Sequence, residues 1–104
     1  MISEFKGPYS YAEKIVREWN SSVPGVYYLG VKTPQNQMII YYIGKAVAEG
    51  GIRSRLLEHL SENKWDDVTH FGYHASQPLD VKAVNELEEE EIKKYSPKYN
   101  TVWA

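Results

Sequence analysis

The sequence predicts a small domain of the mixed α/β (α+β) class, with a mostly antiparallel three-stranded sheet flanked by helices. Two observations support this prediction. Short runs are rich in β-branched and aromatic residues, and longer segments carry apolar residues at helical spacing. With 104 residues, the chain is long enough for one hydrophobic core but not for two. The expected element order is α-β-β-α-β-α.

The segment before residue 24 is expected to be an N-terminal helical extension (residues 1–23) of a main domain covering residues 24–104. Its helix is predicted over residues 11–20 and follows a Ser10 cap, because apolar residues recur there at helical spacing. Residues 1–8 are expected to form a loosely held tail.

Two runs, residues 26–31 and 38–43, predict a β-hairpin joined by the turn at residues 33–37. Both runs are apolar on both faces, which indicates a sheet covered on both sides. Gly44 is expected to end the second strand. Residues 68–75 are predicted to form the third strand.

Two further helices are expected. Gly50 and Gly51 open one that continues to about residue 62, with apolar residues four apart. The other covers residues 81–95 and is stopped by Pro97.

The composition is that of an ordinary globular protein, with 42% hydrophobic and 25% charged residues. The net charge of −2 does not favour a polyanionic partner, so nucleic-acid binding must depend on where the positive charges lie. The absence of cysteine excludes disulfides and cysteinate zinc sites. No apolar run reaches membrane length and no signal-peptide core is present, so we expect a cytoplasmic protein without a membrane partner.

One carboxylate of the last helix occupies an unusual position. At roughly 100° per residue, Glu88 falls within about 40° of the apolar stripe, whereas its acidic neighbours point away or lie at the stripe's edge. The stripe consists of Val81, Val84, Ile92 and Tyr95. A lone buried carboxylate is costly unless it is paired, hydrogen-bonded or bound to a metal. Glu88 is therefore either a functional ligand or acid–base group, or a carboxylate that reaches solvent or a structural arginine.

Arg55 and His59 are spaced i, i+4 and so share one face of their helix. Arginine offers fixed bidentate donors and histidine transfers protons near neutral pH, a pair suited to phosphate chemistry. Most such pairs are surface residues without a function, and that alternative stays open.

Other candidates have simpler explanations. His70 and His74 share a strand face but lie too far apart to form a metal pair without a third ligand. Three tryptophans could stack on nucleic-acid bases, yet packing in or beside the core is favoured for Trp19, Trp65 and Trp103.

Several of these features occur together in a recognisable order. They are GVY at residues 25–27, YIG at residues 42–44, Arg55, His59, Glu88 and the PKYN tail ending at Asn100. This order and spacing resembles the GIY-YIG nuclease superfamily over residues 24–100. The stretch EEEEIKKYSPKYN resembles the closing helix and tail of that family.

The resemblance implies a GIY-YIG-like fold and a metal-dependent endonuclease that hydrolyses phosphodiester bonds, with DNA as the expected substrate. It implies that Tyr27 orients or deprotonates the attacking water, with Tyr42 beside it. Arg55 would hold the scissile phosphate, and His59 would assist proton transfer or hydrogen-bond the tyrosine or the phosphate. Glu88 would ligate one Mg²⁺ or Mn²⁺ ion, a hard cation that one carboxylate, waters and phosphate oxygens can hold.

The resemblance also suggests Lys45, Arg53 and Asn100 as substrate-binding residues, with Asn100 bracing the site rather than reacting. A tyrosine is a poor base at neutral pH unless cations lower its pKa, and the metal, Lys45 and Arg55 are the expected causes. Family members usually obtain target choice from an attached module, a dimer or a partner protein. A homodimer or a targeting partner is therefore expected. The alternative functions are a catalytically weak or inactive nucleic-acid-binding module on the same fold, and a structural or protein-interaction domain.

Overall fold

The protein forms a four-stranded antiparallel sheet with strand order β1-β4-β2-β3 and three helices. The structure is a computed structural model that describes residues 1–100, so the packing expected of Trp103 lies outside the described residues. The strands are β1 (Lys6–Ser10), β2 (Gly25–Lys32), β3 (Met38–Ala46) and β4 (His70–Ala75). The helices are α1 (Glu13–Glu18), α2 (Gly51–Glu62) and α3 (Val81–Tyr95).

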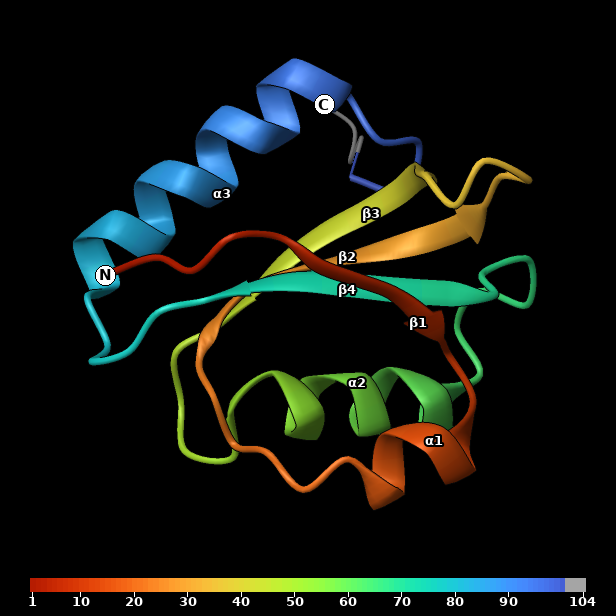
Figure 1. Cartoon of the computed structure of the whole chain (residues 1–104), viewed down its shortest axis with the longest axis horizontal. Helices are drawn as coiled ribbons and strands as arrows, with labels where there is room; N and C mark the ends of the chain where they lie inside the picture. The colour runs from red at the N-terminus through yellow and green to blue at the C-terminus, as the bar shows by residue number, and fades with distance from the viewer. Residues whose placement is uncertain (101–104) are drawn as a thin grey trace.

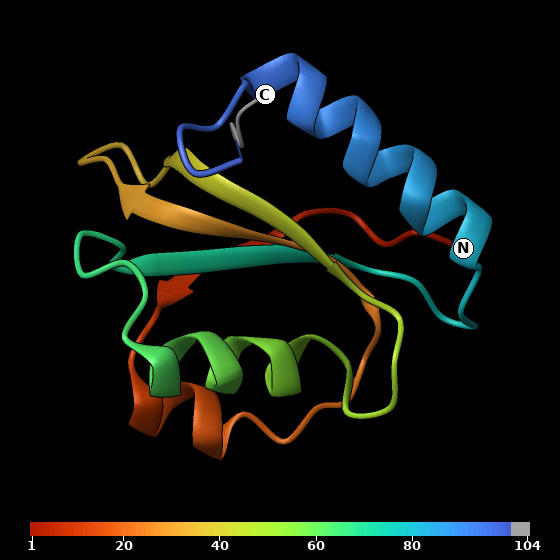
Figure 2. The same ribbon diagram turned by 180° about the vertical axis from the view of Figure 1, so that it is seen from behind.

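Helices cover both faces of the sheet, as predicted from strands that are apolar on both faces. Helices α1 and α2 lie below the sheet and α3 lies above it in Figure 1, and Figure 2 shows the same layers from behind. Successive residues of β2 alternate between the faces. Tyr27 and Leu29 join the core between the sheet and helices α1 and α2, whereas Val26 and Tyr28 join a second core with Val84 of α3.

The sheet has four strands and not the expected three, because the N-terminal segment contributes one. Residues expected to form a loose tail instead form β1, which pairs with β4 through Lys6–Tyr73, Tyr9–Phe71 and Ser10–His70. The proline within this short segment weakens its strand signal, but an edge strand tolerates a missing N–H donor. The N-terminal segment therefore adds both a strand and a helix to the domain.

The boundaries differ where pairing in the sheet outweighs the local sequence pattern. Tyr11 still donates its N–H to the Thr69 carbonyl, so α1 begins later than predicted. Its N-cap is Ala12 without a side-chain bond, and the expected Ser10 cap is wrong. Strand β3 also continues through Gly44 to Ala46, because these residues pair with the start of β2.

Helix α3 has the predicted bounds, and the Asp80 side chain accepts the Ala83 N–H at its start. The predicted apolar stripe is correct only in its middle. Val84 is buried, but Val81 and Tyr95 are 47% and 45% exposed. Leu87 and Ile92 pack against the second core with Val84. The ends of α3 therefore extend beyond its contact with the sheet.

Candidate active site

Tyr27 lies at the centre of the sheet, on β2, where it pairs with Gly44 of β3 and Tyr73 of β4. Its side chain is fully buried. A Cβ atom at position 44 would lie 2.5 Å from Tyr27 Cζ and 2.9 Å from Tyr42 Cε2. The phenol ring therefore occupies the space that a side chain at position 44 would need, and this gives a physical reason for the glycine of the YIG triplet.

The Tyr27 hydroxyl lies 2.9 Å from His59 Nε2, which joins the sheet to α2. His59 is only 5% exposed. Its other ring nitrogen, Nδ1, is buried without a hydrogen-bond partner among the described residues. Burial, reinforced by the charges of Arg55 and Lys64, lowers the pKa of His59. The imidazole is thus held neutral beside a phenol.

Aromatic rings enclose this pair. Tyr42 lies 6.2 Å from Tyr27 and 5.8 Å from His59, measured between ring centroids. Trp65, in the loop after α2, packs 4.6 Å from Tyr42 and stacks on Tyr99 at 5.1 Å and 10°. Because both neighbours take up its faces, Trp65 packs at the core edge rather than offering a platform for bases.

Trp19 also packs against the core, with its ring 5.6 Å from Phe71 and 5.1 Å from Tyr73. The packing predicted for Trp19 and Trp65 is confirmed.

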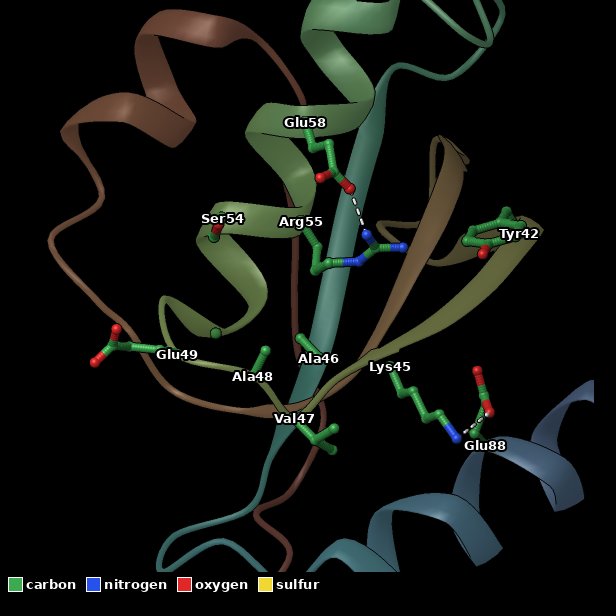
Figure 3. A pocket seen from close by; sticks show the side chains of 11 residues that line it. Tyr42, Lys45, Ala46, Val47, Ala48, Glu49, Ser54, Arg55, Glu58 and Glu88 are labelled. Atoms are coloured by element: carbon green, nitrogen blue, oxygen red, sulfur yellow. Dashed lines mark hydrogen bonds and ion pairs between the residues drawn. The ribbon is translucent and has the colours of Figure 1, made fainter.

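A cavity of about 520 Å³ lies beside these rings. It brings together side chains from β3, α2 and α3, which are far apart in the sequence (Figure 3). The polar lining residues are Tyr42, Lys45, Glu49, Ser54, Arg55, Glu58 and Glu88. Tyr27 lies behind this wall, with its ring 6.2 Å from that of Tyr42, and the charge of Arg55 acts on its pKa.

Arg55 bonds through Nη1 to the Glu58 carboxylate one helical turn along α2. Sequence reasoning did not identify Glu58, although its position three residues after Arg55 was a usable signal. The pair is about half exposed, with side-chain exposures of 41% and 53%. Glu58 therefore occupies one edge of the Arg55 guanidinium.

Burial raises the pKa values of both tyrosines, and Arg55, one of the cations expected to lower them, acts in the opposite direction. For Tyr27, the ionisable phenol of neighbouring Tyr42 adds to the effect of burial, and Arg55 offsets only part of the rise in pKa. For Tyr42, burial again exceeds the opposing effect of Arg55. Burial in low-dielectric surroundings destabilises a phenolate more than a single guanidinium stabilises it. Both phenols are therefore neutral at neutral pH.

Glu88 faces the same cavity from α3 and its side chain is 21% exposed. Burial raises its pKa, while Lys45 acts in the opposite direction. Lys45 Nζ lies 3.8 Å from the carboxylate and donates a 2.6 Å hydrogen bond to Asn85. The partner of Glu88 is thus a lysine rather than the structural arginine considered from sequence.

Within residues 1–100, no group of three histidine and acidic side chains is placed to hold a metal ion. A single carboxylate still fits Mg²⁺ or Mn²⁺, because such ions keep waters and take further oxygens from a bound phosphate. The desolvated Glu88, facing a cavity with a loosely held counter-ion, matches that donor set.

The three expected substrate-binding residues lie in different places. Lys45 lies in the cavity beside Glu88. Asn100 accepts the Ile43 N–H at 2.8 Å and donates to the Ile43 carbonyl at 2.9 Å, so its side chain braces β3 next to Tyr42. Arg53 projects into a different cavity.

No family model matches this chain, and searches of curated proteins and of solved structures likewise gave no match. Among the helices of residues 1–100, none is long and apolar enough to span a membrane.

Proposed function

We propose that the protein is a metal-dependent endonuclease that hydrolyses phosphodiester bonds of nucleic acid, with DNA as the expected substrate. The observation that supports this is the composition of one cavity. Arg55, Glu88 and Tyr42 converge on it from three separate segments, with the Tyr27–His59 pair directly behind. Phosphodiester hydrolysis needs charge stabilisation at the phosphorus and a route for the proton of the attacking water.

In this proposal the proton route begins at Tyr42, the phenol that faces the cavity. The sequence resemblance implied that Tyr27 meets the water, but Tyr27 is fully buried. The ring of Tyr42 lies 6.2 Å from that of Tyr27, and the Tyr27 hydroxyl lies 2.9 Å from Nε2 of neutral His59. Each phenol gives up its proton as it takes one, so no phenolate accumulates despite the raised pKa values. His59 Nε2 is the final acceptor.

Arg55 holds the non-bridging oxygens of the phosphate and the charge that builds on them. To do so it exchanges Glu58 for the substrate. The exchange is inexpensive because an exposed ion pair contributes only about 0–1 kcal/mol. The Glu58 side chain is 53% exposed, so the released carboxylate can turn into solvent and does not remain beside the phosphate on Arg55.

Glu88, with water molecules and a phosphate oxygen, would hold one Mg²⁺ or Mn²⁺ ion, which would neutralise developing charge and assist the leaving oxygen. Lys45 then exchanges its loose contact with Glu88 for a phosphate oxygen. Its long side chain, 40% exposed, can make that move without disturbing the core.

The test is to incubate the purified protein with supercoiled plasmid and with branched DNA, with and without Mg²⁺ or Mn²⁺. We expect metal-dependent nicking, reduced about 10²-fold or more in Glu88→Ala and in Arg55→Ala. Glu90→Ala is the matched control, because Glu90 is an exposed glutamate on the same helix.

Wild-type cutting by Glu88→Ala would overturn the metal assignment. Binding without cutting by the wild-type protein would favour the alternative of a nucleic-acid-binding module, whose affinity should fall steeply with salt.

A further inference from the structure

A cavity of about 210 Å³ lies between the sheet and the second half of α3, on the opposite face of the sheet from Tyr27. Four rings line it: Phe5, Tyr28, His74 and Tyr95. Met38 and Ile40 of β3 add an aliphatic wall. Within residues 1–100, Glu91 is the one carboxylate in the lining, which contains no lysine or arginine. The cavity thus combines aromatic and aliphatic surface with a single negative charge.

The Phe5 ring is held against the sheet although the residue is 40% exposed. It lies over Gly72 of β4, where a Cβ atom would be 2.3 Å from Phe5 Cζ. Its centroid lies 5.5 Å from that of Tyr28 and 5.7 Å from that of His74. His74 Nδ1 in turn donates to the Ser3 carbonyl at 2.8 Å, which fixes the chain just before Phe5. The aromatic wall is therefore in place without a ligand.

Glu91 carries a charge that its contacts within the chain do not require. Its Oε1 accepts the Tyr28 hydroxyl at 2.7 Å, and an uncharged glutamine would supply the same acceptor. Among residues 1–100 Glu91 forms no ion pair. Lys94 Nζ lies 5.1 Å from the Tyr95 ring centroid, but Lys94 does not line the cavity. The half-buried carboxylate is thus available to a cation from outside the chain.

Aromatic rings beside a carboxylate are surroundings that suit an ammonium group. Ring faces attract a cation within about 6 Å of their centroids, and the carboxylate accepts its N–H donors. The same carboxylate repels a phosphate. A nucleic-acid base is also disfavoured, because the rings of Phe5, Tyr28 and His74 meet edge to face at 66–76°. These three rings leave no parallel pair between which a flat base could stack.

The size and the rim of the cavity favour a side chain over a free small molecule. Small-molecule pockets typically measure roughly 300–1,000 Å³, and this one is smaller. Met38 and Ile40 can cover the aliphatic stem of a lysine while its ammonium group meets Glu91. Phe5 and Tyr95, 40% and 45% exposed at the rim, can then contact the residues beside that lysine.

We propose that this cavity binds a lysine side chain of a partner protein, with the ammonium group between the Glu91 carboxylate and the aromatic rings. The proposal does not depend on the nuclease activity, because none of the residues that line this cavity lines the cavity of Arg55.

The experiment titrates the isotope-labelled full chain with a blocked Leu-Lys-Leu tripeptide and follows the backbone amide shifts by NMR. Two matched peptides carry trimethyl-lysine, which stays charged, and Nε-acetyl-lysine, which is neutral. We expect both charged peptides to bind and to shift the amides around Phe5, His74 and Glu91. The acetylated peptide should bind about 5-fold more weakly or less, because it has lost its charge. No saturable shift with either charged peptide, or equal binding of the acetylated one, would overturn the proposal.

Two pairs of variants test the residues themselves. Glu91→Gln removes the charge but keeps an acceptor for Tyr28, and Glu90→Gln makes the same change at an exposed neighbouring position. Glu91→Gln should weaken binding about 5-fold, which corresponds to ~1 kcal/mol for a partly exposed ion pair, and Glu90→Gln should not. Phe5→Leu should weaken binding by about 2- to 5-fold through loss of the ring. Tyr9→Leu, at a similarly exposed ring outside the cavity, should leave it unchanged. Equal effects within either pair would contradict the proposal.

Two other occupants are tested with the same proteins. A single-stranded oligonucleotide that shifts these amides in the wild type but not in Glu91→Gln would assign the cavity to a base. A dimer in sedimentation velocity that Glu91→Gln dissociates would assign it to a second copy of this chain. Either result would overturn the proposal, whereas a monomer whose oligonucleotide shifts lie elsewhere supports it.

Discussion

The Tyr27 hydroxyl lies 2.9 Å from His59 Nε2, and this hydrogen bond joins the centre of the sheet to α2. Tyr27 is anchored by the strands on either side of it, and His59 by the helix beneath. An apolar pair could fill the same space, and the two polar side chains that stand there instead supply the hydrogen bond that the proposed proton route uses.

If the pair relays a proton, its members act as one unit. Tyr27→Phe and His59→Gln should each lower kcat by about 10²- to 10⁴-fold, the usual contribution of general acid–base catalysis. The double variant should lose little more than either single variant, because the second change removes a relay that is already broken. Plasmid nicking rates for the four proteins test this, and independent, multiplying losses would contradict the relay.

In the proposed mechanism Glu58 competes with the substrate phosphate for Arg55, so removing its charge should improve binding. Glu58→Gln keeps the shape and removes the charge, and we expect KM to fall by a factor of about 2 to 5, corresponding to an exposed pair of at most ~1 kcal/mol. Glu90→Gln makes the same charge change on an exposed part of α3 and serves as the control. A KM that is unchanged in Glu58→Gln, or lowered equally in both variants, would show that Glu58 does not restrain Arg55.

The elements predicted well from sequence are those whose signals are local. Helix α3 follows from its apolar periodicity and the proline that stops it, and the i, i+4 spacing of Arg55 and His59 places both on one face. Strand β1 gives no comparable signal, because its five residues gain their pairing only when β4 lies beside them.

The same distinction applies within the candidate site. Helical projection separates Glu88 from its neighbours, since that depends on one helix alone. Which of Tyr27 and Tyr42 meets the cavity depends on how β2 and β3 are paired and covered, and sequence spacing does not reveal it. The balance of burial against the Arg55 charge, which sets the pKa of both phenols, likewise requires the assembled core.

The neutral state of His59 should make stability depend on pH. Burial is the first cause of its lowered pKa; the charges of Arg55 and Lys64 add to it, and Glu62 and Glu58 oppose it. Below the unfolded-state pKa of about 6.5, the unfolded chain binds more protons than the folded one, so the free energy of unfolding falls as pH falls. The contribution of His59 is complete above that value and is lost toward the lowered folded pKa.

Urea unfolding at pH 7.5, 6.5 and 5.5 measures this effect. His59→Gln, which does not titrate, should show a smaller decrease in stability over that interval than the wild type. Parallel pH profiles for the two proteins would mean that His59 is protonated as readily in the folded protein as in the unfolded chain.

Gly44 should tolerate no side chain, because the Tyr27 ring lies against its Cα. In Gly44→Ala the new methyl group would sit 2.5 Å from Tyr27 Cζ, and the ring is enclosed by the core, so it cannot swing away. Overpacking of this kind costs about 1–3 kcal/mol, and for a domain of this size each kilocalorie lowers Tm by roughly 4–8 °C.

Adding Tyr27→Phe removes the hydroxyl that also collides with the methyl group, so the double variant should recover part of the lost Tm. Thermal melts of the wild type, the two single variants and the double variant measure these changes in Tm. A Gly44→Ala protein as stable as the wild type would show that the two residues do not compete for the same space. The same conclusion would follow if Tyr27→Phe lowered the Tm of Gly44→Ala by as much as it lowers that of the wild type.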